Sequence, residues 1–333
     1  MTTEDIKSPR MRAVEAIRAW YARYPELEDI RQHFDRLRGR DNSPGEAGCM
    51  LLHGPARSGK TRLITDYVED HPPVRGEDGD RQEVVYIKAP YPCTPKNLME
   101  QVARDLGHPR PNAIRTSRYG RSGRLFDTMD VVLNYARDLG VQLMFIDEIH
   151  QMIDQKNNRA VMDGATLLKD LVNEATFCLV VSGTSSAKRI FECHEELRGR
   201  MLGNFELQPF QWYDANRRAT FLTLLEGLDG ELPFERSGLA DDDMAVRIHV
   251  ASRGLIGEVA KLIENAGVLA VLQDAPRILM RHLAEAYEMA ALEKGGANPF
   301  LGPAPKPLKL DALPPDGLII RHPGMRGDEV FRP

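Results

Sequence analysis

The sequence has 333 residues, of which 42% are hydrophobic and 28% are charged. This composition is typical of a globular chain with one large domain or two smaller ones, and it excludes disorder throughout the chain. The formal net charge of −5 excludes a basic surface over the whole molecule. Any contact with nucleic acid therefore has to come from a local basic patch.

The four cysteines, Cys49, Cys93, Cys178 and Cys193, are widely spaced. Their spacing fits neither a zinc site nor a disulfide framework, which indicates a reducing compartment. The N-terminal segment carries charges of both signs, and no stretch of the sequence reaches the roughly 20 apolar residues that a bilayer span needs. We therefore expect a cytoplasmic protein with no membrane partner.

A helical pattern occupies residues 10–39, where apolar side chains recur at steps of three and four residues. Pro25 interrupts the pattern, because proline breaks the interior of a helix. We expect two short helices in an N-terminal lead-in over residues 1–45. This lead-in either closes over the adenine of a nucleotide or packs against a neighbouring subunit, and the sequence does not distinguish these two positions.

Short apolar runs alternate with helical patterns in the next part of the chain. Runs of this length, bounded by glycine or by turn residues, indicate strands that are buried on both faces, and their alternation with helices predicts a parallel sheet between helices. We assign this α/β domain to residues 46–211. The strands are predicted over 49–53, 83–89, 142–147 and 176–183, and the helices over 60–70, 95–107, 125–139 and 163–174.

The pattern changes at Trp212 to helices separated by glycine and proline. A small all-helical domain is predicted over residues 212–294, and an extended, poorly ordered proline-rich tail over residues 295–333. The tail is either a peptide docked by a partner or a disordered end. The helices of the domain are predicted over 213–227, 239–250, 255–273 and 276–292.

Residues 54–61 read GPARSGKT and match the P-loop pattern G-x-x-x-x-G-K-[ST]. The motif follows a predicted strand and opens a predicted helix, so that backbone amides and the helix N-terminus face an anion. Lys60 supplies charge to the β- and γ-phosphates of ATP, and Thr61 offers its hydroxyl to Mg²⁺. The alternative is a glycine turn with a solvated lysine. The predicted ATP-binding residues here are Gly54, Pro55, Ala56, Arg57, Ser58, Gly59, Lys60, Thr61 and Arg62.

An acidic pair, Asp147 and Glu148, follows the apolar run LMFI. In open α/β sheets, ligands bind at the carboxyl ends of the strands, so both residues are predicted to line the ATP site. Asp147 is expected to hold Mg²⁺ through its hydration shell, and Glu148 is expected to orient and polarise the attacking water. The alternative is an acidic pair that only ends a strand.

Two further positions are candidates for the same chemistry. Thr184 follows the fourth predicted strand and either contacts the γ-phosphate or the water, or caps the next helix. Arg198 and Arg200 precede the apolar run FELQPF, and they either reach the γ-phosphate of a neighbouring subunit or are solvated surface residues. Lys60, Glu148, Thr184 and the two arginines form the predicted catalytic set.

A basic segment lies between the helices predicted to end at Gly107 and to start near Leu125. It contains five arginines, one tyrosine and no acidic residue, which is suited to a flexible loop that contacts the phosphates of duplex DNA. A solvated loop and a contact with the next subunit are the alternatives. Lys88, Lys156 and Arg159 are weaker candidates. The residues of the segment are Arg110, Arg115, Arg118, Tyr119, Arg121 and Arg124.

The order of these parts resembles that of AAA+ ATPases, with a P-loop after the first strand, an acidic pair after the third, a polar residue after the fourth, an arginine pair before the fifth and then a helical lid. More narrowly, roughly residues 12–302 resemble the TniB/TnsC family of AAA+ transposition regulators. The P-loop and the acidic pair occur in many ATPases, whereas the later motifs are more specific together. The motifs are RYPELEDI, GPARSGKT, LMFIDEIHQM, VVSGT, ELRGRM leading to FELQPF, RGLIGEVAKLIENA and NPF.

The resemblance implies a bacterial AAA+ P-loop NTPase with a helical lid, which assembles with ATP into rings or helical filaments around duplex DNA. It implies recruitment of a DDE transposase and a TniQ-type partner, and hydrolysis that trims the assembly. Thr184 takes the sensor-one position, and Arg200, alone or with Arg198, acts as the finger in trans. The lid departs from the family pattern: the segment after Gly254 has no arginine at the sensor-two position, which leaves that contact absent or shifted to Arg253.

Two other functions fit the same residues. A helicase loader or initiator ATPase shares the fold, and it requires an added DNA-binding module or a helicase partner. A signalling switch that oligomerises on nucleotide binding without nucleic acid shares the phosphate motifs, and it does not require the basic segment. The sequence shows no clear appended module, which favours the transposition regulator.

Overall fold

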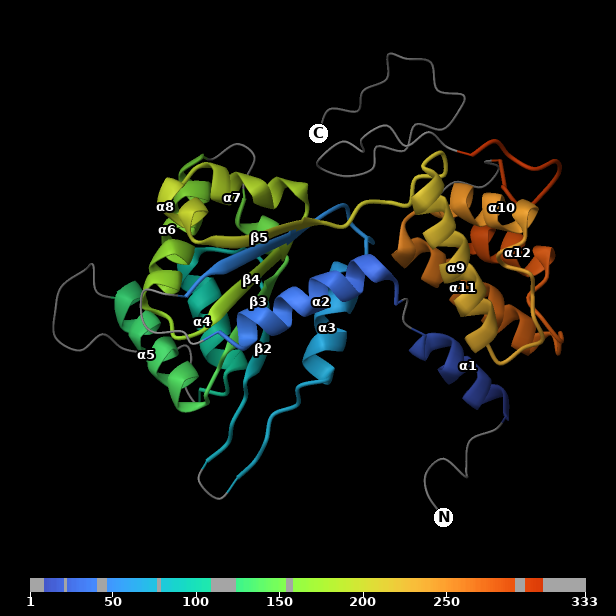
Figure 1. Cartoon of the computed structure of the whole chain (residues 1–333). Helices are drawn as coiled ribbons and strands as arrows, with labels where there is room; N and C mark the ends of the chain where they lie inside the picture. Colours follow the sequence, from blue (N-terminus) through green and yellow to red (C-terminus); the bar gives the residue numbers. More distant parts are fainter. Residues whose placement is uncertain are drawn as a thin grey trace. The chain divides into compact units, whose positions relative to one another are not determined.

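The computed structural model describes residues 9–20, 23–40, 47–76, 79–108, 124–153, 158–290 and 297–307 (Figure 1). These residues fall into two compact units. One unit comprises Pro25–Leu207, and the other combines the segments Met1–Tyr24 and Gln208–Pro333. The two lead-in helices therefore belong to different units, whereas the four-part division of the sequence given above stays a prediction.

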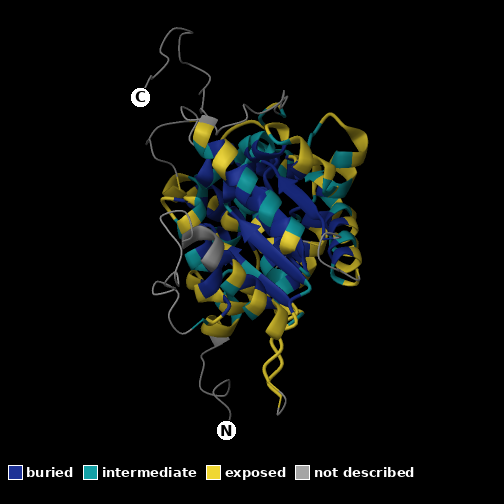
Figure 2. Ribbon diagram, turned by 90° about the vertical axis from the view of Figure 1, so that its left-hand side faces the viewer, coloured by how far each residue is buried: buried dark blue, intermediate teal, exposed yellow. Residues whose placement is uncertain are grey.

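The larger unit is built on a five-stranded parallel sheet with the strand order β2-β3-β4-β1-β5. The three central strands are fully buried, and Figure 2 shows them in the buried colour, whereas the edge strand β5 is only partly covered. The predicted parallel sheet between helices is thus confirmed. The strands are β1 (Cys49–His53), β2 (Val84–Lys88), β3 (Leu143–Asp147), β4 (Cys178–Gly183) and β5 (Met201–Glu206).

Helices cover both faces of this sheet. Alternate strand residues such as Leu51, Ile146 and Val181 share one buried cluster with α4 to α8, whereas α2 and α3 pack on the other face. Two short helices, α7 and α8, lie in a segment for which the sequence analysis gave no helix range. The helical elements are α2 (Pro25–Arg38), α3 (Lys60–Glu69), α4 (Pro95–Asp105), α5 (Arg124–Asp138), α6 (Asn158–Glu174), α7 (Lys188–Glu192) and α8 (Glu195–Gly199), with 3-10 turns η3 (Ile149–Met152) and η4 (Ser185–Ala187).

Helix α2 is tied to α3 and to the sheet through aromatic and ionic contacts. Phe34 packs edge-on against Phe145 of β3 and Tyr67 of α3, with ring centroids 4.9 and 5.2 Å away. Arg31 forms an ion pair with Asp66 of α3 at 2.7 Å, and both side chains are largely buried. Pro25 occupies the first position of this helix. Proline is suited to that position because it has no amide hydrogen, and the first amide of a helix has no partner within the helix.

In the other unit, helices are the regular secondary structure of the described residues, and α1 (Pro9–Ala19) packs against α11. Ile17 of α1 is buried, and it lies so close to Gly267 that an added Cβ there would be 3.0 Å from its Cδ1. Arg18 also pairs with Glu264 at 3.0 Å. The remaining helices are α9 (Ala215–Glu231), α10 (Asp242–Ser252), α11 (Ile256–Leu272) and α12 (Met280–Ala290).

The first part of the proline-rich segment is packed onto this helical unit. Arg247 of α10 donates to the carbonyls of Pro299 at 2.6 Å and Gly302 at 3.1 Å, and Phe300 is buried. Residues 308–333 lie outside the described residues. Among the helices that the structure describes, none is both long and apolar enough to cross a bilayer.

Replacement of Phe34 tests whether α2 is part of the core of the larger unit. Phe34→Ala removes a fully buried ring and leaves a cavity against Phe145 and Tyr67, so we expect it to lower the free energy of unfolding by about 3–5 kcal/mol. Urea denaturation followed by circular dichroism measures this change. The exposed Val74 provides a control, because Val74→Ala should change stability by less than ~0.5 kcal/mol. A similarly small loss for Phe34→Ala would show that α2 does not pack on the sheet.

Candidate functional site

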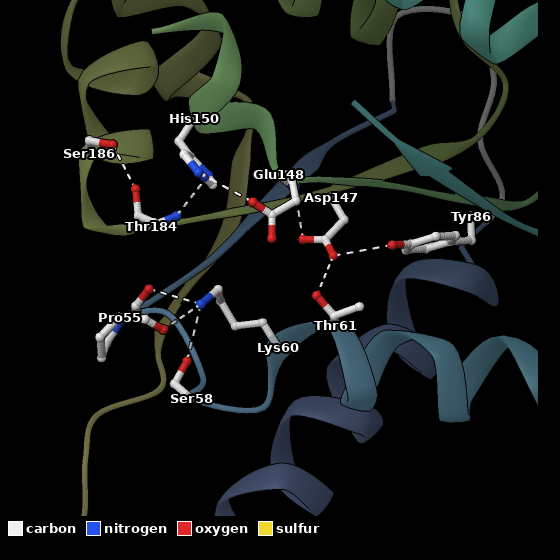
Figure 3. Close-up of polar contacts among 11 residues, drawn as sticks. Pro55, Ser58, Lys60, Thr61, Tyr86, Asp147, Glu148, His150, Thr184 and Ser186 are labelled. Atoms are coloured by element: carbon white, nitrogen blue, oxygen red, sulfur yellow. Dashed lines mark hydrogen bonds and ion pairs between the residues drawn. The ribbon is translucent and has the colours of Figure 1, made fainter. Parts of the chain in front are cut away.

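The predicted phosphate and metal residues meet at the carboxyl edge of the sheet. The P-loop follows β1 and leads into α3, Asp147 ends β3, and Thr184 follows β4. Because the strand order places β4 between β1 and β3, the segment with Thr184 lies between the P-loop and the acidic pair. Figure 3 shows Thr61 and Asp147 pointing toward each other, whereas Lys60 points into its own loop and the hydroxyl of Thr184 points toward Ser186.

The backbone of the P-loop depends on its glycines. Gly54 has a φ of 151°, and an added Cβ would lie 2.3 Å from the carbonyl oxygen of Leu207, so no other residue fits there. Gly59 has a φ of 97° at the N-cap of α3. These two positions let the chain turn from β1 into α3 with the helix N-terminus toward the loop, where an anion is favoured.

The ammonium group of Lys60 lies inside the P-loop. Its Nζ donates to the carbonyl oxygens of Gly54 at 2.9 Å and Pro55 at 2.8 Å, and to the hydroxyl of Ser58 at 3.2 Å. Burial lowers the pKa of Lys60 to about 8, although the carboxylates of Asp147 and Glu148 act in the opposite direction. A bound phosphate would stabilise the charged form of this side chain.

Asp147 is fully buried and accepts hydrogen bonds on both carboxylate oxygens. Its Oδ2 accepts from the hydroxyl of Thr61 at 2.6 Å and from that of Tyr86 at 3.3 Å, and its Oδ1 accepts from the amide of Glu148 at 2.8 Å. The two predicted metal residues, Thr61 and Asp147, are therefore in direct contact. Each donor removes part of the cost of burying the carboxylate.

The donors at this position fit Mg²⁺ in the presence of a nucleotide. Hydroxyl and carboxylate oxygens are the ligands that Mg²⁺ prefers, and it usually binds through one or two protein groups plus phosphates and water. Within the described ranges, no cluster of three or more His, Cys, Asp or Glu residues could hold a metal ion by itself. Thr61 and Asp147 could hold Mg²⁺ only together with phosphate and water oxygens.

Tyr86 and His150 are parts of the site to which the sequence analysis assigned no role. Tyr86 lies on β2, and burial together with the nearby Asp147 raises the pKa of its phenol, so it remains a hydrogen-bond donor. His150 lies in η3, with its Nε2 3.3 Å from Oε2 of Glu148 and its Nδ1 3.4 Å from the amide of Thr184. Their signals are a hydroxyl between the apolar residues Val85 and Ile87 and an imidazole two residues after the acidic pair.

The other residues of the predicted ATP-binding set differ in exposure. Ser58 is buried and Pro55 is partly buried, whereas four residues are exposed. Arg57 has a positive φ of 67° without being glycine. The exposed residues are Ala56, Arg57, Thr61 and Arg62.

Arg198 and Arg200 lie near the amino ends of the strands, whereas the P-loop of the same chain follows the carboxyl end of β1. Arg198 belongs to α8, and the carbonyl oxygen of Arg200 accepts a hydrogen bond from the amide of Cys49 at 3.0 Å. Cys49 starts β1, and the P-loop follows the other end of that strand. The structure therefore does not bring these arginines to the phosphate site of the same chain.

Most of the predicted DNA-binding residues lie outside the described residues. This holds for Arg110, Arg115, Arg118, Tyr119, Arg121 and Lys156. Arg124 begins α5, but its side chain is outside the description, Lys88 is exposed at the end of β2, and Arg159 lies on α6. Arg253 follows α10 as its C-cap residue in the helical unit, with a φ of 54°. The DNA contact and the sensor-two contact remain predictions.

Comparison with solved structures shows which fold this is. The Cdc6p protein of Pyrobaculum aerophilum matches with a TM-score of 0.56 and 14% identity over 84% of this chain and 71% of that chain. The ORC1 protein of Aeropyrum pernix, solved in complex with DNA, matches with a TM-score of 0.57 and 16% identity over 82% of this chain and 68% of that chain. These likenesses show the AAA+ P-loop ATPase fold. The comparison with curated proteins gave no significant match.

A family model described as bacterial TniB protein matches residues 10–212. The match spans more than half of the chain, and it includes the P-loop, the acidic pair, Thr184 and the arginine pair. It confirms the narrower resemblance drawn from the sequence motifs. The chain has the AAA+ P-loop fold and belongs to the TniB family.

Proposed function

We propose that this protein is an ATP-dependent, DNA-binding regulator of DNA transposition. It oligomerises on duplex target DNA, works with a TniQ-type protein, and recruits or activates a DDE transposase, and ATP hydrolysis drives its disassembly. The observation that carries the proposal is the 2.6 Å contact that joins Thr61 to Asp147 at the edge where Lys60 lies, in a chain of the TniB family.

The proposed reaction is Mg²⁺-dependent hydrolysis of ATP to ADP and phosphate. The P-loop amides and Lys60 would bind the phosphates, and Thr61 and Asp147 would hold Mg²⁺, which would supply positive charge to neutralise the phosphates. Glu148 accepts a hydrogen bond from the attacking water and orients it toward the γ-phosphate. The backbone amide of Glu148 donates a hydrogen bond to Asp147. This contact supports the placement of Glu148 next to the proposed metal position.

The position of the arginine pair supports activity in an oligomer. Arg198 and Arg200 lie near the amino ends of the strands, whereas the P-loop follows a carboxyl end. They can therefore reach a γ-phosphate only in another copy of the chain. An arginine finger supplied in this way accelerates hydrolysis by roughly 10³–10⁵-fold in other nucleotide hydrolases. A ring or a helical filament provides such a contact between neighbours.

The DNA-binding part of the proposal rests on the basic segment with Arg115, Arg118, Tyr119, Arg121 and Arg124. Five positive charges within residues 108–124, on a chain with a net charge of −5, provide the local patch that phosphate contacts require. The fold is compatible with this function, since the similar ORC1 protein was solved in complex with DNA. Repetition of the segment in an oligomer multiplies weak contacts.

Loss of Lys60 should remove the nucleotide response. Lys60→Ala deletes the charge that neutralises the phosphates, so we expect ATP affinity to fall by roughly 30-fold or more, equivalent to about 2 kcal/mol, and assembly to be lost. Isothermal titration calorimetry measures the affinity. Lys169→Ala, on α6 away from the P-loop, should bind ATP like the native protein. Retained ATP-dependent assembly in Lys60→Ala would contradict the nucleotide switch.

Glu148→Gln separates binding from hydrolysis. The amide cannot accept a proton from water, so turnover should fall by roughly 100-fold or more while ATP affinity is kept, and the protein should persist on DNA. Phosphate release and gel-shift lifetimes measure the two effects. Glu69→Gln, at the far end of α3, is the matched control and should leave both unchanged. If Glu148→Gln has native turnover, another group positions the water.

The basic segment is tested by replacing three of its arginines together. Arg115→Ala, Arg118→Ala and Arg121→Ala should weaken duplex binding similarly for all sequences and lower the slope of log affinity against log salt by about 1 for each DNA phosphate that the variant no longer neutralises. Fluorescence anisotropy at several salt concentrations measures both quantities. The exposed pair Arg75→Ala and Arg81→Ala is the control. An unchanged salt slope in the triple variant would place the DNA surface elsewhere.

A further inference from the structure

An imidazole lies between the two polar segments that end β3 and β4. His150, in the 3-10 turn η3, places its Nε2 3.3 Å from Oε2 of Glu148. Its Nδ1 is 3.4 Å from the backbone nitrogen of Thr184, on the segment after the neighbouring strand. Figure 3 shows the ring between the carboxylate and the Thr184 backbone. His150 thus connects the proposed water-orienting carboxylate with the proposed sensor segment.

The partners determine which ring nitrogen carries the proton. The backbone amide of Thr184 can only donate, so Nδ1 has to be the unprotonated, accepting nitrogen. The remaining nitrogen, Nε2, then carries the hydrogen and donates it to the carboxylate of Glu148. The neutral ring therefore holds Glu148 without removing its negative charge, which the carboxylate needs in order to polarise water.

The local backbone brings the ring to this position. Glu148 has a left-handed conformation with a φ of 60°, which turns the chain sharply after β3 and starts η3. For a residue other than glycine this conformation is strained, and such strain clusters at functional sites. On the other side, an added Cβ at Gly183 would lie 3.1 Å from Cβ of Ala187 and 3.3 Å from the amide nitrogen of His150, so the bare glycine leaves room for the backbone of η3 beside the end of β4.

We propose that His150 is a positioning residue for ATP hydrolysis. It donates a hydrogen bond to Oε2 of Glu148 and accepts one from the amide of Thr184, and it thereby fixes the orientation of the Glu148 carboxylate. This inference depends on the proposed role of Glu148 as the group that orients the attacking water. With Oε2 held by the imidazole, the second carboxylate oxygen is the one assigned to the water.

The same arrangement links Thr184 to catalysis without direct contact between its side chain and Glu148. The hydroxyl of Thr184 lies 2.8 Å from that of Ser186, and its amide supports the ring. A shift of the Thr184 segment on contact with a γ-phosphate would therefore move the imidazole, and with it the carboxylate. Hydrolysis would then depend on the segment after β4 as well as on the acidic pair.

The test separates hydrogen bonding from packing in the full-length protein. His150→Phe keeps a flat ring and removes both polar atoms, whereas His150→Gln keeps a donor near the position of Nε2. We expect His150→Phe to lower kcat by roughly 10-fold or more with ATP affinity kept within about twofold, as for loss of one hydrogen bond to a charged group. His150→Gln should recover part of this loss. His71→Phe, two residues after the end of α3, is the control and should leave kcat unchanged.

A double variant gives the second readout. If His150 acts through Glu148, His150→Phe should lower the residual turnover of Glu148→Gln no further. Three results would overturn the proposal. They are native turnover in His150→Phe, equal turnover in His150→Phe and His150→Gln, and loss of ATP affinity in these two variants. Absence of ATPase activity in the native protein would instead contradict the proposed function. Normal turnover in His150→Phe together with slow turnover in Glu148→Gln would remove only the role of His150.

Discussion

The hydrogen bond from Thr61 to Asp147 is the contact on which the site depends, because it joins α3 to the end of β3 at 2.6 Å although β4 separates β1 from β3. Asp147 has no exposed surface, and a carboxylate in that environment is tolerated only when donors surround it. Its donors come from α3, from Tyr86 on β2 and from the amide of Glu148. A change in any of these elements is therefore transmitted to the proposed metal position.

The chemistry is distributed along one sheet edge. Asp147 holds the turn into Glu148, His150 connects Glu148 to the segment after β4, and the P-loop follows β1 beside it. The arginine pair lies near the amino ends of the strands, away from this site. In the proposed function, the P-loop binds nucleotide within one chain, whereas the arginine pair that accelerates hydrolysis comes from a neighbouring copy. This division would link turnover to the proposed assembly on DNA.

The sequence predicted the parts that depend on local pattern. The run CMLLH and the run LMFID are continuous apolar strands next to recognisable motifs, so the sheet, the P-loop and the acidic pair could be located. The short helix α8 and the alternating edge strand β5 carry weak local signals, and FELQPF overlaps only the end of that strand. The contacts of Tyr86 and His150 depend on which strands are neighbours, and the strand order cannot be read from periodicity.

The most direct measurement of the central claim is electron microscopy of the purified protein with duplex DNA and a non-hydrolysable ATP analogue, compared with ADP and with samples that lack DNA. The proposed function predicts rings or helical filaments threaded by DNA only with the ATP analogue. Oligomers that form with nucleotide in the same way with and without DNA, and that leave the DNA bare, would contradict it and would favour a nucleotide-driven switch without nucleic acid.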